Sequence, residues 1–167
     1  MNEQNAFFRE ADQHHLYRKC VGILLLNSEG MIFGGVRRDG ISDVYQMPQG
    51  GIDEGESPRN SALRELYEET GIKSSDVEVL DCLDRWLYYD IPKEIACKIW
   101  EGKYMGQCQK WFAVRFMGCD SEVDINSLHP EFSSWGWFPK KFLMENIVGF
   151  KRPVYTEVFS FFNRYIV

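Results

Sequence analysis

The sequence has no apolar run that approaches the ~20 residues needed to span a bilayer, and its first fifteen residues contain no signal-peptide core. It also lacks a CxxC pair, and its cysteines are odd in number and widely spaced, which is typical of reduced thiols that serve in packing. A net charge of −6 offers no basic face for binding along a nucleic-acid backbone, so we expect no DNA partner. These absences predict a cytoplasmic protein without a membrane segment or a disulfide framework. The five cysteines are Cys20, Cys82, Cys97, Cys108 and Cys119.

Length and composition favour a compact globule. The 167 residues are 44% hydrophobic and 15% aromatic, which is enough apolar material for one sizeable core. No repeat or linker divides the chain. We therefore expect a single domain over 1–167, with 1–15 as a flexible N-terminal extension.

Mixed hydrophobic periodicities predict both strands and helices. Two apolar runs joined by a polar turn favour a hairpin, and a helical apolar spacing from Val154 to Ile166 favours a closing amphipathic helix. The predicted strands are 20–26, 31–36, 45–47, 77–89, 109–118 and 135–138, with a polar loop over 37–44 and a further helix at 93–100. Such a mixture predicts an α/β fold arranged as a three-layer α/β/α sandwich.

One further helix is well marked over 58–70. Ser57 is a good N-cap, Pro58 fits the first helical position, and Gly71 suits the left-handed residue that ends a helix. Ala62 and Leu66, together with Leu63, supply its inward face.

Three glutamates crowd one patch of this helix. Glu65 faces both Glu68 and Glu69, because residues three and four apart are neighbours on a helix, and like charges so placed cost stability. Arg64 lies four residues before Glu68 and eight after Glu56, so it can hold glutamates in position. An all-oxygen donor set without histidine or cysteine favours Mg²⁺ or Mn²⁺ over zinc.

An ordinary solvated acidic helix is the alternative for the glutamates taken alone. The surrounding pattern fixes nine positions over 23 residues: Gly50, Glu56, Arg64, Glu65, Leu66, Glu68, Glu69, Gly71 and Ile72. This segment resembles the box of the Nudix family without a mismatch, which favours a catalytic helix.

The resemblance continues beyond the box, to the bacterial Nudix branch that contains RNA pyrophosphohydrolases and dinucleoside polyphosphate hydrolases. The matching stretches are YRKCVGILLLN at 17–27, RRDG at 37–40, YQMPQGGIDEGE at 45–56, GQCQKWF at 106–112, HPEFSSWGWF at 129–138 and FKRPVY at 150–155. Two positions depart from the family: Lys19 replaces the usual proline, and Tyr45 replaces the usual tryptophan. Neither belongs to the glutamate cluster.

The resemblance implies a Nudix α/β/α sandwich with a mixed β-sheet and assigns roles by position. It makes Glu65, Glu68 and Glu69 metal ligands, with the Gly50 carbonyl as a further one and Glu131 as a fourth carboxylate. On residues alone, Glu131 would be a solvated loop carboxylate. The residues implied to lie near the substrate's phosphates and first base are Arg18, Arg38, Phe150 and Lys151.

The implied reaction is Mg²⁺- or Mn²⁺-dependent hydrolysis of a phosphoanhydride bond in a nucleoside 5′-polyphosphate. RNA with a 5′-triphosphate end is the first expected substrate, and a dinucleoside polyphosphate such as diadenosine tetraphosphate is the alternative. Glu65, Glu69 and Glu131 are all candidates for the general base. A non-catalytic Nudix module that only binds nucleotide or a protein partner is the alternative outside enzymes, although this chain has kept every box glutamate.

Overall fold

A computed structural model describes residues 11–38 and 44–167 of the chain. Its strands are β1 (Tyr17–Leu26), β2 (Ile32–Arg37), β3 (Tyr45–Gln46), β4 (Gln49–Gly51), β5 (Val77–Cys82), β6 (Leu87–Asp90), β7 (Gly106–Phe116) and β8 (Phe132–Phe138). Its α-helices are α1 (Pro58–Thr70), α2 (Lys93–Trp100), α3 (Lys140–Asn146) and α4 (Arg152–Phe161). Short 3-10 helices cover Ala11–Leu16, Ser74–Asp76, Asp120–Glu122, Gly149–Lys151 and Asn163–Tyr165.

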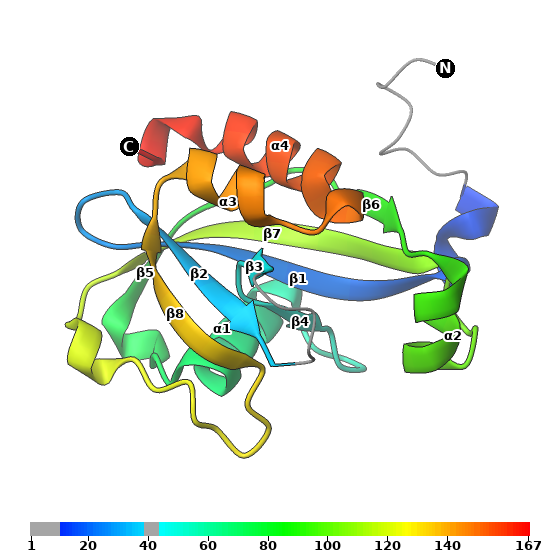
Figure 1. Ribbon diagram of the computed structural model, residues 1–167, viewed down its shortest axis with the longest axis horizontal. Coiled ribbons are helices and arrows are strands. Elements are labelled where there is room, and N and C mark those ends of the chain that lie inside the picture. The colour runs from blue at the N-terminus through cyan, green and yellow to red at the C-terminus, as the bar shows by residue number, and fades with distance from the viewer. Residues whose placement is uncertain (1–10, 39–43) are drawn as a thin grey trace.

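The eight strands of the described residues form one mixed sheet. Its main order is β3-β2-β1-β7-β5, while β4 pairs with β1, β6 with β7 and β8 with β2. Only the β1–β7 pair is parallel among the pairings of this sheet. Helices α3 and α4 cover one face and α1 covers the other (Figure 1). The predicted α/β/α sandwich with a mixed sheet is therefore confirmed.

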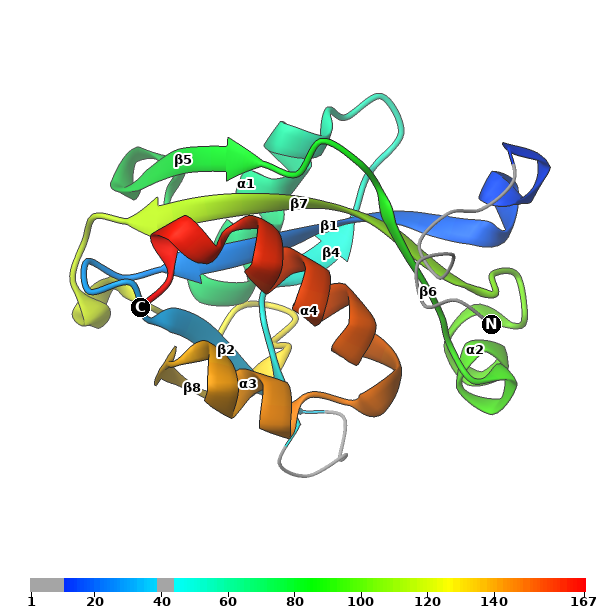
Figure 2. The same cartoon turned by 90° about the horizontal axis from the view of Figure 1, so that it is seen from above.

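Alternating side chains on β1 fill both halves of the core. Val21, Ile23 and Leu25 pack with α1, whereas Leu24 and Leu26 join the cluster under α3 and α4. This period of two is what a strand buried on both faces requires. Seen from above, α4 runs across β7 and β1 (Figure 2).

Strand β1 changes its hydrogen-bonded neighbour along its length, and a cleft lies at this change. At one end β1 pairs with β2 through Leu26 and Ile32. Toward its other end β1 pairs instead with β4, from Cys20 opposite Gly51 to Gly22 opposite Gln49. The glycine-rich β4 then leads into α1, so the box glutamates lie beside this change of partner.

Several predicted boundaries need correction. The strand expected over 77–89 is divided into β5 and β6 by a bend at Asp84 and Arg85, where the Arg85 guanidinium pairs with Glu157 on α4 at 2.7 Å. Strand β8 begins at Phe132 rather than at residue 135, and β7 begins at Gly106 and ends at Phe116. The closing helix begins at Arg152 and ends at Phe161, so Ile166 lies beyond it.

Other predicted elements are confirmed, and two predicted segments lie partly outside the described residues. The helices over 58–70 and 93–100 and the hairpin of β1 and β2 are confirmed. Helix α3 was not predicted. Of the proposed N-terminal extension, residues 11–15 belong to a 3-10 helix and 1–10 lie outside the described residues, as do 39–43 of the expected polar loop.

The five cysteines are free thiols. Cys20 and Cys108 are buried, and burial raises their pKa to about 12 and about 11. Cys97 and Cys119 are exposed, so the prediction that all five serve in packing is wrong for these two. In the part of the chain that the structure describes, no helix has the length and apolarity to cross a membrane.

Candidate active site

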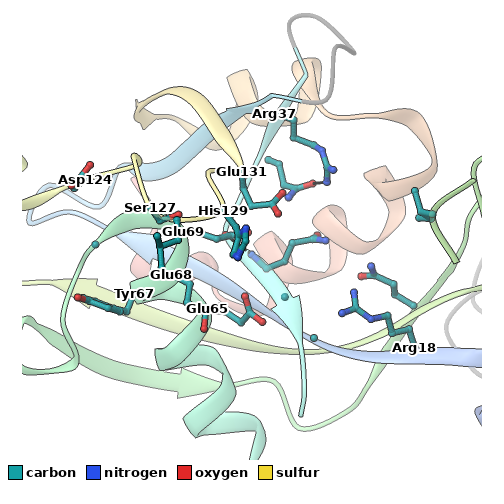
Figure 3. Close-up of a pocket in the computed structure, with 18 of the residues that line it drawn as sticks. Arg18, Arg37, Glu65, Tyr67, Glu68, Glu69, Asp124, Ser127, His129 and Glu131 are labelled. Carbon is teal, nitrogen blue, oxygen red and sulfur yellow. Dashed lines mark hydrogen bonds between the residues drawn. The ribbon is translucent and has the colours of Figure 1, made fainter.

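A cavity of about 740 Å³ lies beside the C-terminal half of α1. Its lining includes the three glutamates of α1, the loop before β8 and the beginning of β1 (Figure 3). Figure 3 shows Glu65, Glu68 and Glu69 projecting from α1 on one side, with Glu131 approaching from the β8 side. Arg18 on β1 lies toward the opposite end of the cavity.

Local sequence fixes where α1 begins and ends. The Ser57 hydroxyl accepts a hydrogen bond from the Asn60 backbone N–H at 3.2 Å, and Gly71 ends the helix with φ 70°. The N–H of Gly71 donates to the Tyr67 carbonyl at 2.8 Å, so the last turn is closed without strain. Both caps agree with the sequence prediction.

The three helix glutamates differ in burial. Glu69 is buried with 5% of its surface exposed, whereas the side chain of Glu68 is 55% exposed. Glu65 is intermediate, with a side chain that is 14% exposed. The carboxylates therefore line the cavity from its protein wall to its solvent-facing edge.

Arg64 is the cation that holds this cluster together. Its guanidinium binds both carboxylate oxygens of Glu56, at 3.0 and 2.8 Å, and also donates to the Gly51 carbonyl at 2.8 Å. The other terminal nitrogen donates to Glu65 at 2.9 Å and to Glu68 at 3.3 Å. The expectation that Arg64 can hold the glutamates in position agrees with these contacts.

Arg64 also makes the carboxyl of Glu56 unusually acidic. The hydrogen bonds from Arg64 lower the pKa of Glu56 from its ordinary value of 4.5 to about 2. Because the folded pKa is below the unfolded one, the ion pair stabilises the fold above pH 4.5 and its contribution is lost as the pH falls toward 2.

Arg64→Gln should therefore lower stability more at neutral than at acid pH. We expect a larger difference in free energy of unfolding between parent and variant at pH 7 than at pH 3, measured by urea denaturation. Arg59→Gln, at an exposed position of the same helix, is the matched control and should follow the parent at both pH values. Equal destabilisation by Arg64→Gln at both pH values would contradict this role.

Burial sets the electrostatics of the inner glutamates. Desolvation raises the pKa of Glu69 well above its ordinary value, and the nearby charges of Glu131 and Glu65 raise it further. The Gln49 backbone N–H, which donates to Glu69 at 3.1 Å, opposes this only in part. Burial likewise raises the pKa of Glu65, against the effect of Arg64. A proton or a cation must accompany these buried carboxylates.

Gly50 brings the backbone directly against Glu65. A Cβ atom at position 50 would lie 1.9 Å from the Glu65 carboxyl carbon, so only glycine allows this approach. The close approach places main chain and carboxylate on one wall of the cavity. This is the arrangement expected if the Gly50 carbonyl and Glu65 serve one ion.

The loop before β8 carries Glu131 and His129 into the cavity (Figure 3). It is anchored by Arg38, whose backbone N–H donates to the Glu131 carbonyl at 2.9 Å and whose side chain donates to the Phe132 carbonyl at 2.8 Å. A further contact joins Arg38 to Asn126 at 3.3 Å. Arg38 is thus held against this loop.

Of the four residues predicted to bind substrate, the structure places only Arg18 in the cavity lining. Arg18 lines the cavity, and so does Arg37, whereas the resemblance assigned its neighbour Arg38 to the substrate. Lys151 is buried under the cavity wall with its Nζ 3.1 Å from the Gln49 side-chain oxygen. Phe150 stacks on Tyr89 with ring centroids 6.0 Å apart and packs against the core.

The cavity also contains residues that sequence reasoning did not select. His129 lies two residues before the predicted Glu131. The other lining residues, Gln46, Gln49 and Gln107, lie in the quoted family stretches, but no spacing singled them out. Their shared signal is membership of short motifs at the ends of strands.

The donor chemistry of the site fits a hard divalent cation. Glu65, Glu68, Glu69 and Glu131 offer carboxylate oxygens to one cavity, and Gly50 adds main chain beside them. Across residues 11–38 and 44–167, however, no three acidic, histidine or cysteine side chains are already gathered into a metal site. Arg64 instead binds Glu65 and Glu68 in this conformation. The residues present suit Mg²⁺ or Mn²⁺ once these side chains turn inward.

The four glutamates that line one cavity beside the central sheet of this α/β/α sandwich are the oxygen donors that a metal-dependent hydrolase requires. A family model described as the NUDIX domain matches residues 16–158. The chain belongs to the Nudix family, as its sequence predicted.

Curated relatives support the same branch. An RNA pyrophosphohydrolase of Roseobacter denitrificans is 50% identical over 150 residues, covering 90% of this chain and 94% of the relative. One of Rhodopseudomonas palustris is 52% identical over 151 residues, covering 85% of each chain. The predicted resemblance to the branch that contains RNA pyrophosphohydrolases is thus confirmed.

Solved structures support the fold. A C. elegans Ap4A hydrolase in a binary complex aligns with a TM-score of 0.62 at 16% identity, covering 87% of this chain and 98% of that one. An E. coli dihydroneopterin triphosphate pyrophosphohydrolase aligns with a TM-score of 0.63 at 17% identity, covering 86% and 97%. At such low identity these similarities establish the fold alone.

Proposed function

We propose that this protein is a Mg²⁺- or Mn²⁺-dependent RNA 5′-pyrophosphohydrolase that converts 5′-triphosphate RNA to 5′-monophosphate RNA in the cytoplasm. The observation that carries the reaction type is a cavity lined by four glutamates and two arginines, which are Glu65, Glu68, Glu69, Glu131, Arg18 and Arg37. Carboxylates can hold divalent ions, and arginines bind phosphate oxygens in bidentate fashion. Relatives named RNA pyrophosphohydrolase at about half identity over most of the chain support RNA as the substrate.

Each group of residues has a separate task in the proposed reaction. Glu65, Glu68, Glu69 and Glu131, with the Gly50 carbonyl, would hold the divalent ions. When bound, such an ion supplies Lewis acidity that acidifies water and neutralises charge on the phosphate chain. Arg64 orients the glutamates by holding Glu65 and Glu68 from the same helix.

Glu131 is the strongest of the three candidates for proton acceptor. Within the described residues no cation pairs with its carboxylate, whereas Glu65 is held by Arg64 and Glu69 by the Gln49 backbone N–H. Glu131 is exposed to the cavity and lies on a loop, so it can approach a water molecule beside the phosphate. It would also retain the ligand role that the family implies.

Arg18 and Arg37 would bind the phosphate chain. Arg18 lies close against Gly51, since its terminal nitrogen is 2.4 Å from where a Cβ at that glycine would be. Lys151 and Arg38, which the sequence also assigned to the substrate, would contribute from behind the cavity wall and from the loop anchor. Phe150 would require a change of side-chain position to reach a base, because it is packed on Tyr89.

A dinucleoside polyphosphate is the second candidate substrate. The cavity of about 740 Å³ extends past the glutamates to Ile99 and Trp100 on α2, which leaves an apolar wall available to a second nucleoside. A non-catalytic module is disfavoured because every box glutamate is kept.

A parallel assay tests the proposal. Purified protein with Mg²⁺ should hydrolyse 5′-triphosphate RNA with a kcat/KM at least about tenfold above that for diadenosine tetraphosphate, which corresponds to about 1.4 kcal/mol of discrimination. The variant Glu131→Gln is the control for contaminating phosphatase. Because it should be impaired, hydrolysis that it retains at the parent rate would come from a contaminant. The reverse preference would favour the second candidate, and hydrolysis of neither substrate would overturn the proposed activity.

A further inference from the structure

A chain of hydrogen bonds connects the buried side chain of Trp111 on β7 with glutamines that line the cavity. The Trp111 indole N–H donates to the Gln109 side-chain oxygen at 3.0 Å. The Gln109 amide nitrogen in turn donates to the side-chain oxygens of Gln107, at 2.9 Å, and Gln49, at 3.3 Å. Gln107 and Gln49 both line the cavity, so the buried indole is connected to its wall.

The chemistry of Trp111 fixes the direction of this chain. An indole N–H can only donate, so Gln109 must turn its oxygen toward Trp111 and its nitrogen toward Gln107 and Gln49. Those two glutamines must then accept with their own oxygens. One donor-only group therefore determines which way three amides face.

Two more donors reinforce the same orientation. The Tyr89 hydroxyl donates to the Gln107 oxygen at 2.8 Å, and the Lys151 ammonium donates to the Gln49 oxygen at 3.1 Å. Each of these oxygens thus accepts two hydrogen bonds, which uses both of its lone pairs.

Gln46 on β3 repeats the pattern. Its oxygen accepts from Lys151 at 2.5 Å and from Arg37 at 3.3 Å. Gln46 and Gln107 are only 2% and 6% exposed, yet no described residue accepts from their amide nitrogens. Because the described residues contain no buried side-chain nitrogen without a partner, those N–H groups must open into the cavity.

We propose that Gln46, Gln49 and Gln107, here called the amide wall, form a subsite that binds hydrogen-bond acceptor oxygens, and that Trp111 is the positioning residue that orients it through Gln109. With their own oxygens occupied, the wall residues can offer only N–H donors to a ligand. Arg37 lines the same cavity, and Arg18 pairs with Gln107 across β1 and β7. The subsite therefore suits the acceptor-only oxygens of a phosphate chain, and a base carbonyl is the other source of the same chemistry.

The position of the indole is itself closely determined. A Cβ atom on Gly22 would lie 2.4 Å from the Trp111 ring, so the ring lies flat against that glycine on β1. Tyr155 packs edge-on against the indole with ring centroids 5.8 Å apart. Trp111 is completely buried and cannot reach substrate, so it acts only through Gln109.

The inference rests on the proposed active site, but its test does not require turnover. Calorimetric titration of metal-free protein with inorganic tripolyphosphate, and separately with guanosine and adenosine 5′-monophosphates, measures the subsite directly. Gln107→Met, which removes a wall donor, and Trp111→Phe, which removes the orienting N–H but keeps an aromatic ring, should each weaken tripolyphosphate binding about tenfold. Gln13→Met, at an exposed glutamine outside the cavity lining, is the matched control and should bind like the parent.

The outcomes distinguish the two ligand sources and the two proposals. Weakened tripolyphosphate binding assigns the wall to the phosphate chain, and weakened binding of guanosine monophosphate alone assigns it to a base carbonyl. Unchanged binding of all three ligands in both variants would overturn the subsite, whatever the hydrolysis assay gives. Gln109→Met covers the case in which Trp111→Phe fails to fold, and it should reproduce the loss. In turnover assays the wall variants should raise KM more than they lower kcat, whereas a general loss of structure lowers kcat and thermal stability together.

Discussion

Glu69→Gln is expected to abolish hydrolysis while leaving a folded protein that resists heat better than the parent. The substitution keeps the size of the side chain but removes the charge that a divalent ion requires. Loss of at least about 10²-fold in kcat is expected, in line with the removal of one preorganised electrostatic group. The gain in stability follows from the buried position of Glu69, which is 5% exposed.

The sign of that gain depends on pH. Burial raises the pKa of Glu69 in the folded state above its ordinary value of 4.5, so the folded protein binds more protons than the unfolded chain above that pH. Stability of the metal-free parent therefore falls as the pH rises from 4.5 through the folded pKa, and glutamine removes this loss. Melting curves without metal should show a larger advantage of the variant at pH 8 than at pH 5.

Two comparisons make the Glu69 result decisive. Glu54→Gln, at an exposed position of the loop before α1, should match the parent in both activity and melting temperature. Added Mg²⁺ should raise the melting temperature of the parent but not that of Glu69→Gln, because only a bound ion stabilises the folded state. A variant with full activity would remove Glu69 from the mechanism.

Gly50→Ala is the second substitution with a large expected effect. The new methyl group would lie within 2.3 Å of all three atoms of the Glu65 carboxyl group, which forces either the carboxylate or β4 to move. A displacement of about 1 Å in a catalytic group can cost on the order of 10²-fold in rate. We expect kcat to fall by about that factor, although the mutated residue bears no functional side chain.

Gly149→Ala provides the control for Gly50→Ala. A Cβ at Gly149 meets no atom within 4 Å, so the same addition of one methyl group should leave kcat and melting temperature close to the parent values. The two variants separate the general effect of replacing glycine from the effect of crowding Glu65. Parent-like activity of Gly50→Ala would show that the close approach of Gly50 and Glu65 has no role in turnover.

The sequence predicts α1 and its glutamates well because their determinants are local. Ser57 and Gly71 mark the helix ends through bonds to their own neighbours, and Arg64 reaches residues four and eight positions away. Such interactions join residues that are near one another in the sequence. The α/β/α layers were likewise predictable from hydrophobic periodicity and from the family resemblance.

What the sequence does not predict depends on distant contacts. The bend that divides β5 from β6 is held by Arg85 and Glu157, which are far apart in the chain. Arg37 and Arg38 are adjacent and carry the same side chain, and Arg38 is held away from the cavity by its bond to the Phe132 carbonyl, far along the chain. The orientation of Gln107 likewise depends on Trp111 through an intermediate side chain. Hydrophobic periodicity carries no information about contacts between residues that are far apart in the sequence.

The parallel pairing of β1 with β7 has a consequence for how the protein folds during its synthesis on the ribosome. Tyr17 and Gly106, which are partners at one end of this pairing, are separated by 89 positions. Closing so long a loop is slow and costs entropy, so the pairing forms only after most of the chain has been made. The acidic helix α1 precedes β7 in the chain, and its caps lie within its own segment. During synthesis, Glu65, Glu68 and Glu69 therefore leave the ribosome before Gln107, the last residue of the amide wall to be made.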